Sequence, residues 1–209
     1  MAVKPGPVQN TVFINCPFDN AYKPIFDALI FATLDLGFVA RHALVDNSTP
    51  MRLDRIVTEI VNAEYSVHDI SRIQTSGPAS LPRFNMPFEA GIAYCAQKMS
   101  PIGHRHFLLL DATPYQYQAS MSDVAGLDPK IHNDDPQDAI NAIRHFLVTK
   151  SGIQNLPGAV HIGARHALFK ANLPSLLPKI KVTQAEIDSF EYLNDLQFLM
   201  TEWMQLNPS

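Results

Sequence analysis

Glu89 is the residue whose position in the sequence points most clearly to chemistry. It lies in the segment 85–93, where a helical period of 3.6 residues puts it on one face with Met86, Ile92 and Ala93. Burial of an unpaired carboxylate costs several kcal/mol or shifts its pKa, so such a group is usually hydrogen-bonded, ion-paired or used in a reaction. A half-exposed glutamate that favours the macrodipole at a helix start is the alternative that this pattern leaves open.

Strands that alternate with helices are predicted to position Glu89. Apolar runs between turn residues predict strands, and apolar residues at helical spacing predict helices. This alternation is typical of a parallel sheet, so we expect a flavodoxin-like or Rossmann-like three-layer α/β fold with a C-terminal helical extension. The strands are expected at 11–15, 38–44, 65–70 and 106–111, with a short fifth strand within 114–136, and the helices at 23–36, 53–61, around Glu89 and at 137–149.

The chemistry is expected at the carboxyl ends of the strands, where open α/β sheets bind their ligands. Six polar residues follow the predicted strands or open the helix between the third and fourth strands, and the fold would bring them together. Neither GxGxxG nor GxxxxGK[ST] occurs, so dinucleotide redox binding and P-loop phosphoryl transfer lose their usual sequence support. The six residues are Asn15, Asp19, Asp69, Ser71, Asn85 and Glu89.

Two domains are predicted, an α/β domain over 1–150 and a helical extension over 151–209 packed on it. The extension should hold two or three helices, and the last is hydrophobic at several positions up to Trp203. A helix of this kind packs against the same chain or docks another protein.

Composition limits the partners. The chain has 209 residues, 46% of them hydrophobic, and a formal charge of −4, which indicates a globular protein without the basic excess that extended nucleic acid requires. No apolar run is long enough for a membrane span, and the N-terminus lacks the apolar core of a signal peptide, so we expect a cytoplasmic protein. Cys16 and Cys95 have no metal-ligand spacing, and we expect reduced thiols, no metal and no cofactor.

Three segments carry a family resemblance: the loop Asn15–Phe18, the strand end His68–Ser71 and the helix start Glu89–Ala93. Together they resemble the nucleoside 2-deoxyribosyltransferase-like superfamily, which is related to Toll/interleukin-1 receptor (TIR) domains. The resemblance covers about residues 11–111. The insert from Arg72 to Arg83 departs from the compact family pattern, and nothing after Lys150 is covered.

The resemblance implies a role for each matching residue. In that family the glutamate acts on the anomeric carbon of the sugar, so Glu89 is the implied nucleophile. The two loops carry sugar or base contacts in the family, which implies this role for Asn15, Phe18, Asp69 and Ser71.

The two carboxylates and Arg83 also have roles that physical chemistry suggests. Cleavage of an N-glycosidic bond passes through an oxocarbenium-like state that an ionised Glu89 would stabilise or capture, with Asn85 or the helix N-terminus holding the anion. Asp69 would bind sugar hydroxyls or protonate the leaving base, and a strand-end residue that caps the next loop is its alternative. Arg83 would grip a phosphate or pair with Glu89, and an ordinary surface arginine is the alternative.

The preferred hypothesis is an N-glycosidic-bond enzyme, a hydrolase or a glycosyltransferase, that acts on a nucleoside, nucleotide or NAD-like molecule. A TIR-like NAD hydrolase, in bacterial antiphage defence, is a variant of this hypothesis. The rival is a non-catalytic nucleotide-sensing or interaction module, because fold does not fix function. A structural subunit that docks a partner through the Trp203 helix, and a homo-oligomer, are compatible with the sequence.

Overall fold

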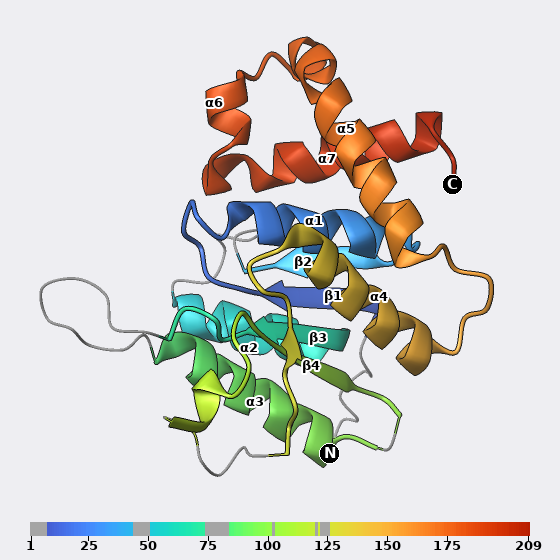
Figure 1. Ribbon diagram of the computed structural model, residues 1–209. Helices are drawn as coiled ribbons and strands as arrows, with labels where there is room; N and C mark the ends of the chain where they lie inside the picture. Colours follow the sequence, from blue (N-terminus) through green and yellow to red (C-terminus); the bar gives the residue numbers. More distant parts are fainter. Residues whose placement is uncertain (1–7, 44–50, 74–83, 102, 120, 122–125) are drawn as a thin grey trace, which may run out of the picture. The chain divides into compact units, whose positions relative to one another are not determined.

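The computed structural model describes residues 8–43, 51–73, 84–101, 103–119, 121 and 126–209. It contains a five-stranded sheet in which every described pair of neighbouring strands is parallel. The strand order β2-β1-β3-β4-β5 is that of flavodoxin-like folds (Figure 1). This confirms the predicted α/β class with C-terminal helices. The strands are β1 (Val8–Asn15), β2 (Val39–His42), β3 (Ala63–Asp69), β4 (His106–Asp111) and β5 (Lys130–Ile131).

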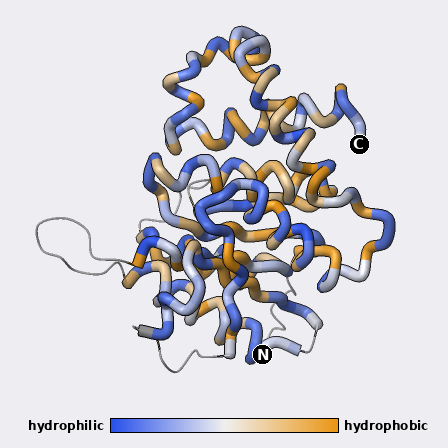
Figure 2. The backbone as a smooth tube through the Cα atoms, in the orientation of Figure 1, coloured by the Kyte–Doolittle hydropathy of each residue, from blue (hydrophilic) through white to orange (hydrophobic). Residues whose placement is uncertain are grey.

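The strands are apolar because both faces of a parallel sheet are covered. In β1 every residue from Thr11 to Asn15 is buried, and the tube in Figure 2 is largely orange along the central strands. The register places Asn15 of β1 beside His68 of β3. Polar side chains therefore appear where these strands end, as the sequence predicts.

The chain forms two compact units by its internal contacts. The sheet unit comprises Met1–Pro17 and Val39–Asn133. In it, α2 (Arg52–Asn62) and α3 (Asn85–Met99) contact each other and pack on the same face of the sheet (Figure 1). A short 3-10 helix, η1 (Gln116–Ala119), follows β4. Beneath α3, a core cluster joins Ile70, Met86, Ala90, Leu109 and Tyr117.

The helical unit comprises Phe18–Phe38 and Asp134–Ser209. Its aromatic core includes Phe31, Phe169 and Trp203, whose ring centroids lie within 6.0 Å of one another. Hydrophobic and hydrophilic residues alternate along its last helices (Figure 2). Its elements are α1 (Lys23–Asp35), α4 (Pro136–Ser151), α5 (Ala159–Ile180), α6 (Gln184–Ile187), the 3-10 helix η3 (Phe190–Tyr192) and α7 (Leu193–Leu206).

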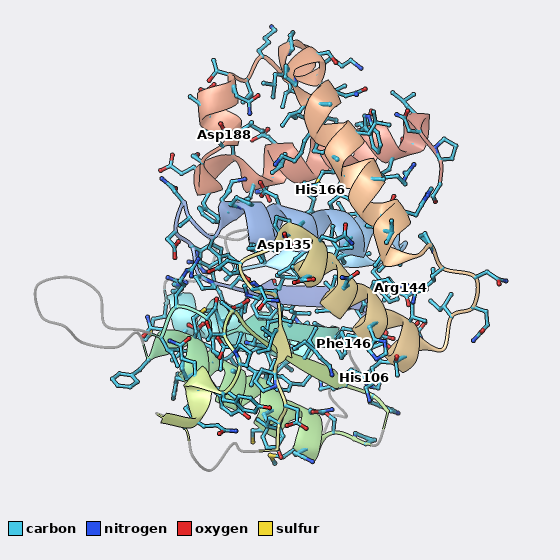
Figure 3. All side chains as sticks on the ribbon, in the orientation of Figure 1. His106, Asp135, Arg144, Phe146, His166 and Asp188 are labelled. Carbon is cyan, nitrogen blue, oxygen red and sulfur yellow. The ribbon has the colours of Figure 1, made fainter. Side chains whose placement is uncertain are left out.

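The helix ends follow local sequence signals. Gly37, with φ of 82°, ends α1, and the Phe38 N–H reaches back to the Thr33 carbonyl as in a Schellman motif. Asp135, labelled in Figure 3, caps the first turn of α4 with its side chain. Thr183 and Glu186 form a capping box on α6.

The compact units differ from the domains expected from sequence, because α1 and α4 group with the C-terminal helices. The division into 1–150 and 151–209 stays a prediction. None of the helices in the described residues is both long enough and apolar enough to cross a bilayer.

Candidate functional site

Glu89 lies near the start of α3 and is buried, with 5% of its surface exposed. Met86 and Ala93 are buried on the same helix, as the sequence predicts, and so is Ala90, whereas Ile92 of the predicted stripe is only half-buried. The Asn15 amide, at the end of β1, donates a hydrogen bond of 2.7 Å from Nδ2 to Glu89 Oε2. The structure therefore brings together two predicted site residues that are 74 positions apart in sequence.

Burial sets the electrostatics of this carboxylate. Loss of solvent raises the pKa of Glu89 above its ordinary value, while the Asn15 hydrogen bond and the Arg52 charge oppose that shift. Asn15 thus holds the carboxylate, whereas Asn85, which the sequence offered for that role as an alternative to the helix N-terminus, is exposed at the first position of α3. An anion with so little solvation responds strongly to positive charge that develops next to it.

A third residue, His68, extends this contact into a buried polar network. Asn15 Nδ2 lies 3.3 Å from His68 Nδ1, and His68 Nε2 lies 2.6 Å from Ser66 Oγ. Burial lowers the pKa of His68 to about 3, so its imidazole is neutral. If Nδ1 accepts from the amide, Nε2 carries the proton and donates to Ser66. The network fixes the orientation of the Asn15 amide, whose Oδ1 is buried without a hydrogen bond among the described residues.

Asp69, the other predicted carboxylate, belongs to a second polar cluster. Its Oδ1 accepts a 2.7 Å hydrogen bond from the Ser71 backbone N–H and another from the Ser71 hydroxyl. Its Oδ2 lies 2.9 Å from His132 Nε2, and both side chains are completely buried. The predicted pair of Asp69 and Ser71 is therefore in contact, and the loop-capping geometry weighed for Asp69 is present as well.

Asp111, at the end of β4, lies close enough to this cluster for the Asp69 charge to act on it. Burial raises the pKa of Asp111, the Thr113 N–H opposes the shift, and the Asp69 charge adds to it. Its Oδ2 is buried and has no hydrogen-bond partner among the described residues. The His132 N–H donates to the Asp111 carbonyl at 3.0 Å, which ties the residue after β5 to the end of β4. This set places ionisable side chains at the carboxyl edge of the sheet.

The two clusters leave β3 in opposite directions, because successive side chains of a strand point to opposite faces. His68 faces the Asn15–Glu89 contact, and the next residue, Asp69, faces His132. His132 is a site residue that the sequence did not single out. The signal for His132 was a polar residue directly after a strand, but two-residue β5 is too short to show a period.

The remaining predicted site residues belong to the helical unit or lie outside the described residues. Phe18 is in the helical unit, with its ring 5.8 Å from Phe26 and 5.4 Å from Phe190. Asp19 is in the same unit, and its side chain accepts a hydrogen bond from the Tyr22 N–H. Arg83 lies outside the described residues.

A cavity of about 200 Å³ opens beside the carboxyl ends of β4 and β5. Tyr115 and Tyr117 line it together with Asp128, and Tyr115 is three-quarters exposed. Exposed aromatic rings offer a stacking surface to a planar ligand. In the described part of the chain, no three His, Cys, Asp or Glu side chains gather in a way that would hold a metal ion.

In comparisons with known proteins, no family model and no curated protein sequence matches this chain.

Proposed function

We propose that the protein cleaves or transfers an N-glycosidic bond of a nucleoside, nucleotide or NAD-like molecule, with Glu89 acting at the anomeric carbon. The observation that supports this most is the buried Glu89 carboxylate, hydrogen-bonded by Asn15 at the carboxyl end of β1. Burial makes the ionised form costly, and an enzyme uses such a group where positive charge develops in the transition state.

The chemistry requires an ionised Glu89. As the bond between the sugar and the base breaks, the anomeric carbon gains positive charge, and the carboxylate stabilises it or forms a covalent bond to it. A hydrolase then delivers water to that carbon, and a transferase delivers a second base. The Asn15 amide favours the charged form by donating to Oε2.

The leaving base also needs a proton. The Asp69–His132 pair and the buried Asp111 supply ionisable groups at the same edge of the sheet, and Tyr115 supplies an exposed ring for a base. We assign proton donation to this cluster and base stacking to the cavity beside Tyr115.

A non-catalytic nucleotide-sensing or TIR-like interaction module is the second candidate. This candidate is favoured by the continuous hydrogen-bond network from Glu89 through Asn15 and His68 to Ser66, because a buried polar network of this kind also stabilises a fold. NAD hydrolysis in antiphage defence remains the substrate variant of the first proposal.

The test is a chromatographic assay of the purified protein and of Glu89→Gln against nucleosides, deoxynucleotides and NAD. The glutamine keeps an oxygen that can accept from Asn15 but lacks the charge, so we expect it to bind substrate and to lose at least about 100-fold in turnover. The matched control is Glu202→Gln, an exposed glutamate on α7, which should release base at the wild-type rate.

The assay separates the two candidate functions. Release of free base or nicotinamide by the wild type and by Glu202→Gln, but not by Glu89→Gln, supports the glycosidic reaction and identifies its substrate. Equal release by all three proteins would remove Glu89 from the mechanism. Binding of a nucleotide with no release by any of them would favour the sensing module.

A further inference from the structure

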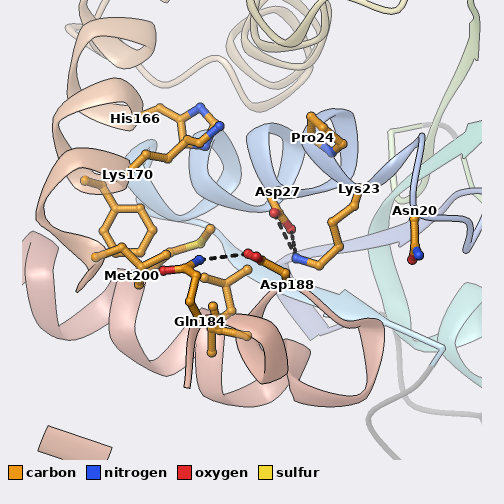
Figure 4. Close-up of a pocket in the computed structure, with 13 residues that line it drawn as sticks. Asn20, Lys23, Pro24, Asp27, His166, Lys170, Gln184, Asp188 and Met200 are labelled. Atoms are coloured by element: carbon orange, nitrogen blue, oxygen red, sulfur yellow. Dashed lines mark hydrogen bonds and ion pairs between the residues drawn. The ribbon is translucent and has the colours of Figure 1, made fainter. Parts of the chain in front are cut away.

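The helical unit contains a cavity of about 400 Å³ that the proposed reaction does not use. Its walls come from α1, α5, α6 and α7, so segments from both ends of the chain line it (Figure 4). A volume of this size is in the range of small-molecule sites. All of the residues that line it belong to the helical unit.

One side of the cavity is apolar. Phe169 and Leu173 of α5 and Leu196 and Met200 of α7 line it, and each has less than a tenth of its surface exposed. This wall would bury the apolar part of a ligand, which is the main source of binding energy in small-molecule sites.

The opposite side holds a buried ion pair. Lys23 Nζ lies 2.7 and 2.8 Å from the two oxygens of Asp27, and only 7% of Lys23 is exposed. Burial raises the pKa of Asp27, and the Lys23 charge and hydrogen bond oppose that shift. A carboxylate with further acceptor capacity and an ammonium group thus face the cavity together.

His166 of α5 also lines the cavity, and its buried Nε2 has no hydrogen-bond partner among the described residues. Its ring packs on Phe31 with centroids 5.1 Å apart, and only 6% of the residue is exposed. Figure 4 shows the imidazole reaching from α5 towards α1. A polar ring that is more than nine-tenths buried and lacks a partner calls for an explanation, and a bound ligand or water supplies one.

Two exposed residues of opposite charge complete the lining, Lys170 on α5 and Asp188 at the end of α6 (Figure 4). Gln184 holds the Asp188 carboxylate with a 2.8 Å hydrogen bond. Both charges act on Asp27: Lys170 lowers the pKa of Asp27 and Asp188 raises it. The lining therefore carries two positive and two negative charges that cancel.

From this lining we propose that the helical unit binds a zwitterionic small molecule, an α-amino acid with an apolar side chain. Its carboxylate meets Lys170, its ammonium group meets Asp188 and Asp27, and its side chain lies on Phe169, Leu173 and Met200. His166 contributes a hydrogen bond to the polar end. A ligand with a single charge would pair with either Lys170 or Asp188 and leave the other without a partner, so a zwitterion fits best.

The test compares three probes of the same apolar body by isothermal titration calorimetry: L-phenylalanine, 2-phenylethylamine and 3-phenylpropanoate. The full-length protein should bind L-phenylalanine at least about tenfold more tightly than either probe, because each of them lacks one of the two charged groups. L-Leucine and L-methionine extend the series to aliphatic side chains. Equal binding of the three probes, or binding of none of these five compounds, overturns the proposal.

Two variants locate the site without disturbing the core. Lys170→Gln and Asp188→Asn remove exposed charges and should each weaken L-phenylalanine binding about tenfold or more. Lys179→Gln, an exposed lysine on α5 outside the cavity, is the matched control and should bind as the wild type does. Trp203 fluorescence reports whether each variant keeps the fold of this unit. Unchanged affinity in both folded cavity variants would place any binding elsewhere and overturn the assignment.

Discussion

At the scale of single residues, the contribution of the buried Glu89 to the free energy of unfolding depends on pH. Its pKa is raised by burial, so the folded protein binds a proton there more readily than the unfolded chain does. The contribution of Glu89 to the free energy of unfolding is therefore largest below about pH 4.3, the ordinary pKa of glutamate, and is lost as pH rises through the folded-state pKa.

The substitution Glu89→Gln should remove this loss of unfolding free energy at high pH. We expect the variant to unfold at a urea concentration equal to or higher than that of the wild type at pH 7.5, and the difference to shrink towards pH 4. Glu186→Gln provides a control of opposite sign, because hydrogen bonds from Thr183 lower the pKa of Glu186. That variant should lose stability at pH 7.5 instead. A Glu89→Gln variant destabilised at pH 7.5 by as much as at pH 4 would contradict the expected linkage.

The sequence predicts the placement of a single side chain where a local pattern determines it. Glu89 faces inward because its helix carries a stripe of small and apolar residues, and that stripe is visible in the segment 85–93. Its contact with Asn15 follows only after the strand order is known. The pairing of Asp69 with His132 joins residues 63 positions apart and depends on where β5 lies, so no local pattern contains it.

At the scale of elements, α4 offers a sharp test of how local sequence begins a helix. Asp135 accepts hydrogen bonds from the Gln137 and Asp138 N–H groups at 2.7 and 3.0 Å, and Pro136 occupies the first helical position. Asp135→Ala should lower the free energy of unfolding by about 1 kcal/mol, because two N–H groups lose their acceptor. Asp135→Asn keeps a side-chain acceptor and should lose less. No loss in urea denaturation of Asp135→Ala would show that the cap does not stabilise the helix.

The succession of strands and helices was predictable because both periods are strong in this chain. All four expected strands and the helices between them are present, with ends that differ by a few residues. From the sequence, β5 could be predicted only as a short strand somewhere within a loop, because it has two residues. The grouping of α1 and α4 with α5 and α7 depends on which apolar faces meet in three dimensions, which a single sequence pattern does not specify.

At the scale of the whole molecule, buried histidines make the fold sensitive to acid. Burial lowers the pKa of His42 to about 4, of His68 to about 3 and of His166 to about 4. An unfolded histidine has a pKa of about 6.5, so the unfolded chain binds these protons first. Each histidine therefore reduces the free energy of unfolding as pH falls below about 6.5, by up to about 1.4 kcal/mol per pH unit.

His166 allows this effect to be measured in one unit, because Trp203, the single tryptophan of the chain, lies in the same helical unit. His166→Phe keeps an aromatic ring against Phe31 and removes the titrating group, so its unfolding midpoint in urea should depend less on pH between 7 and 5 than that of the wild type.

The exposed His145 supplies the control His145→Gln, which should keep the wild-type slope. Buried acids with raised pKa values, such as Asp27 and Asp35, act in the opposite direction but are present in all three proteins, so the difference between slopes isolates His166. Identical slopes for the wild type and His166→Phe would mean that His166 takes up its proton in the folded protein near pH 6.5, and that burial does not keep its imidazole neutral.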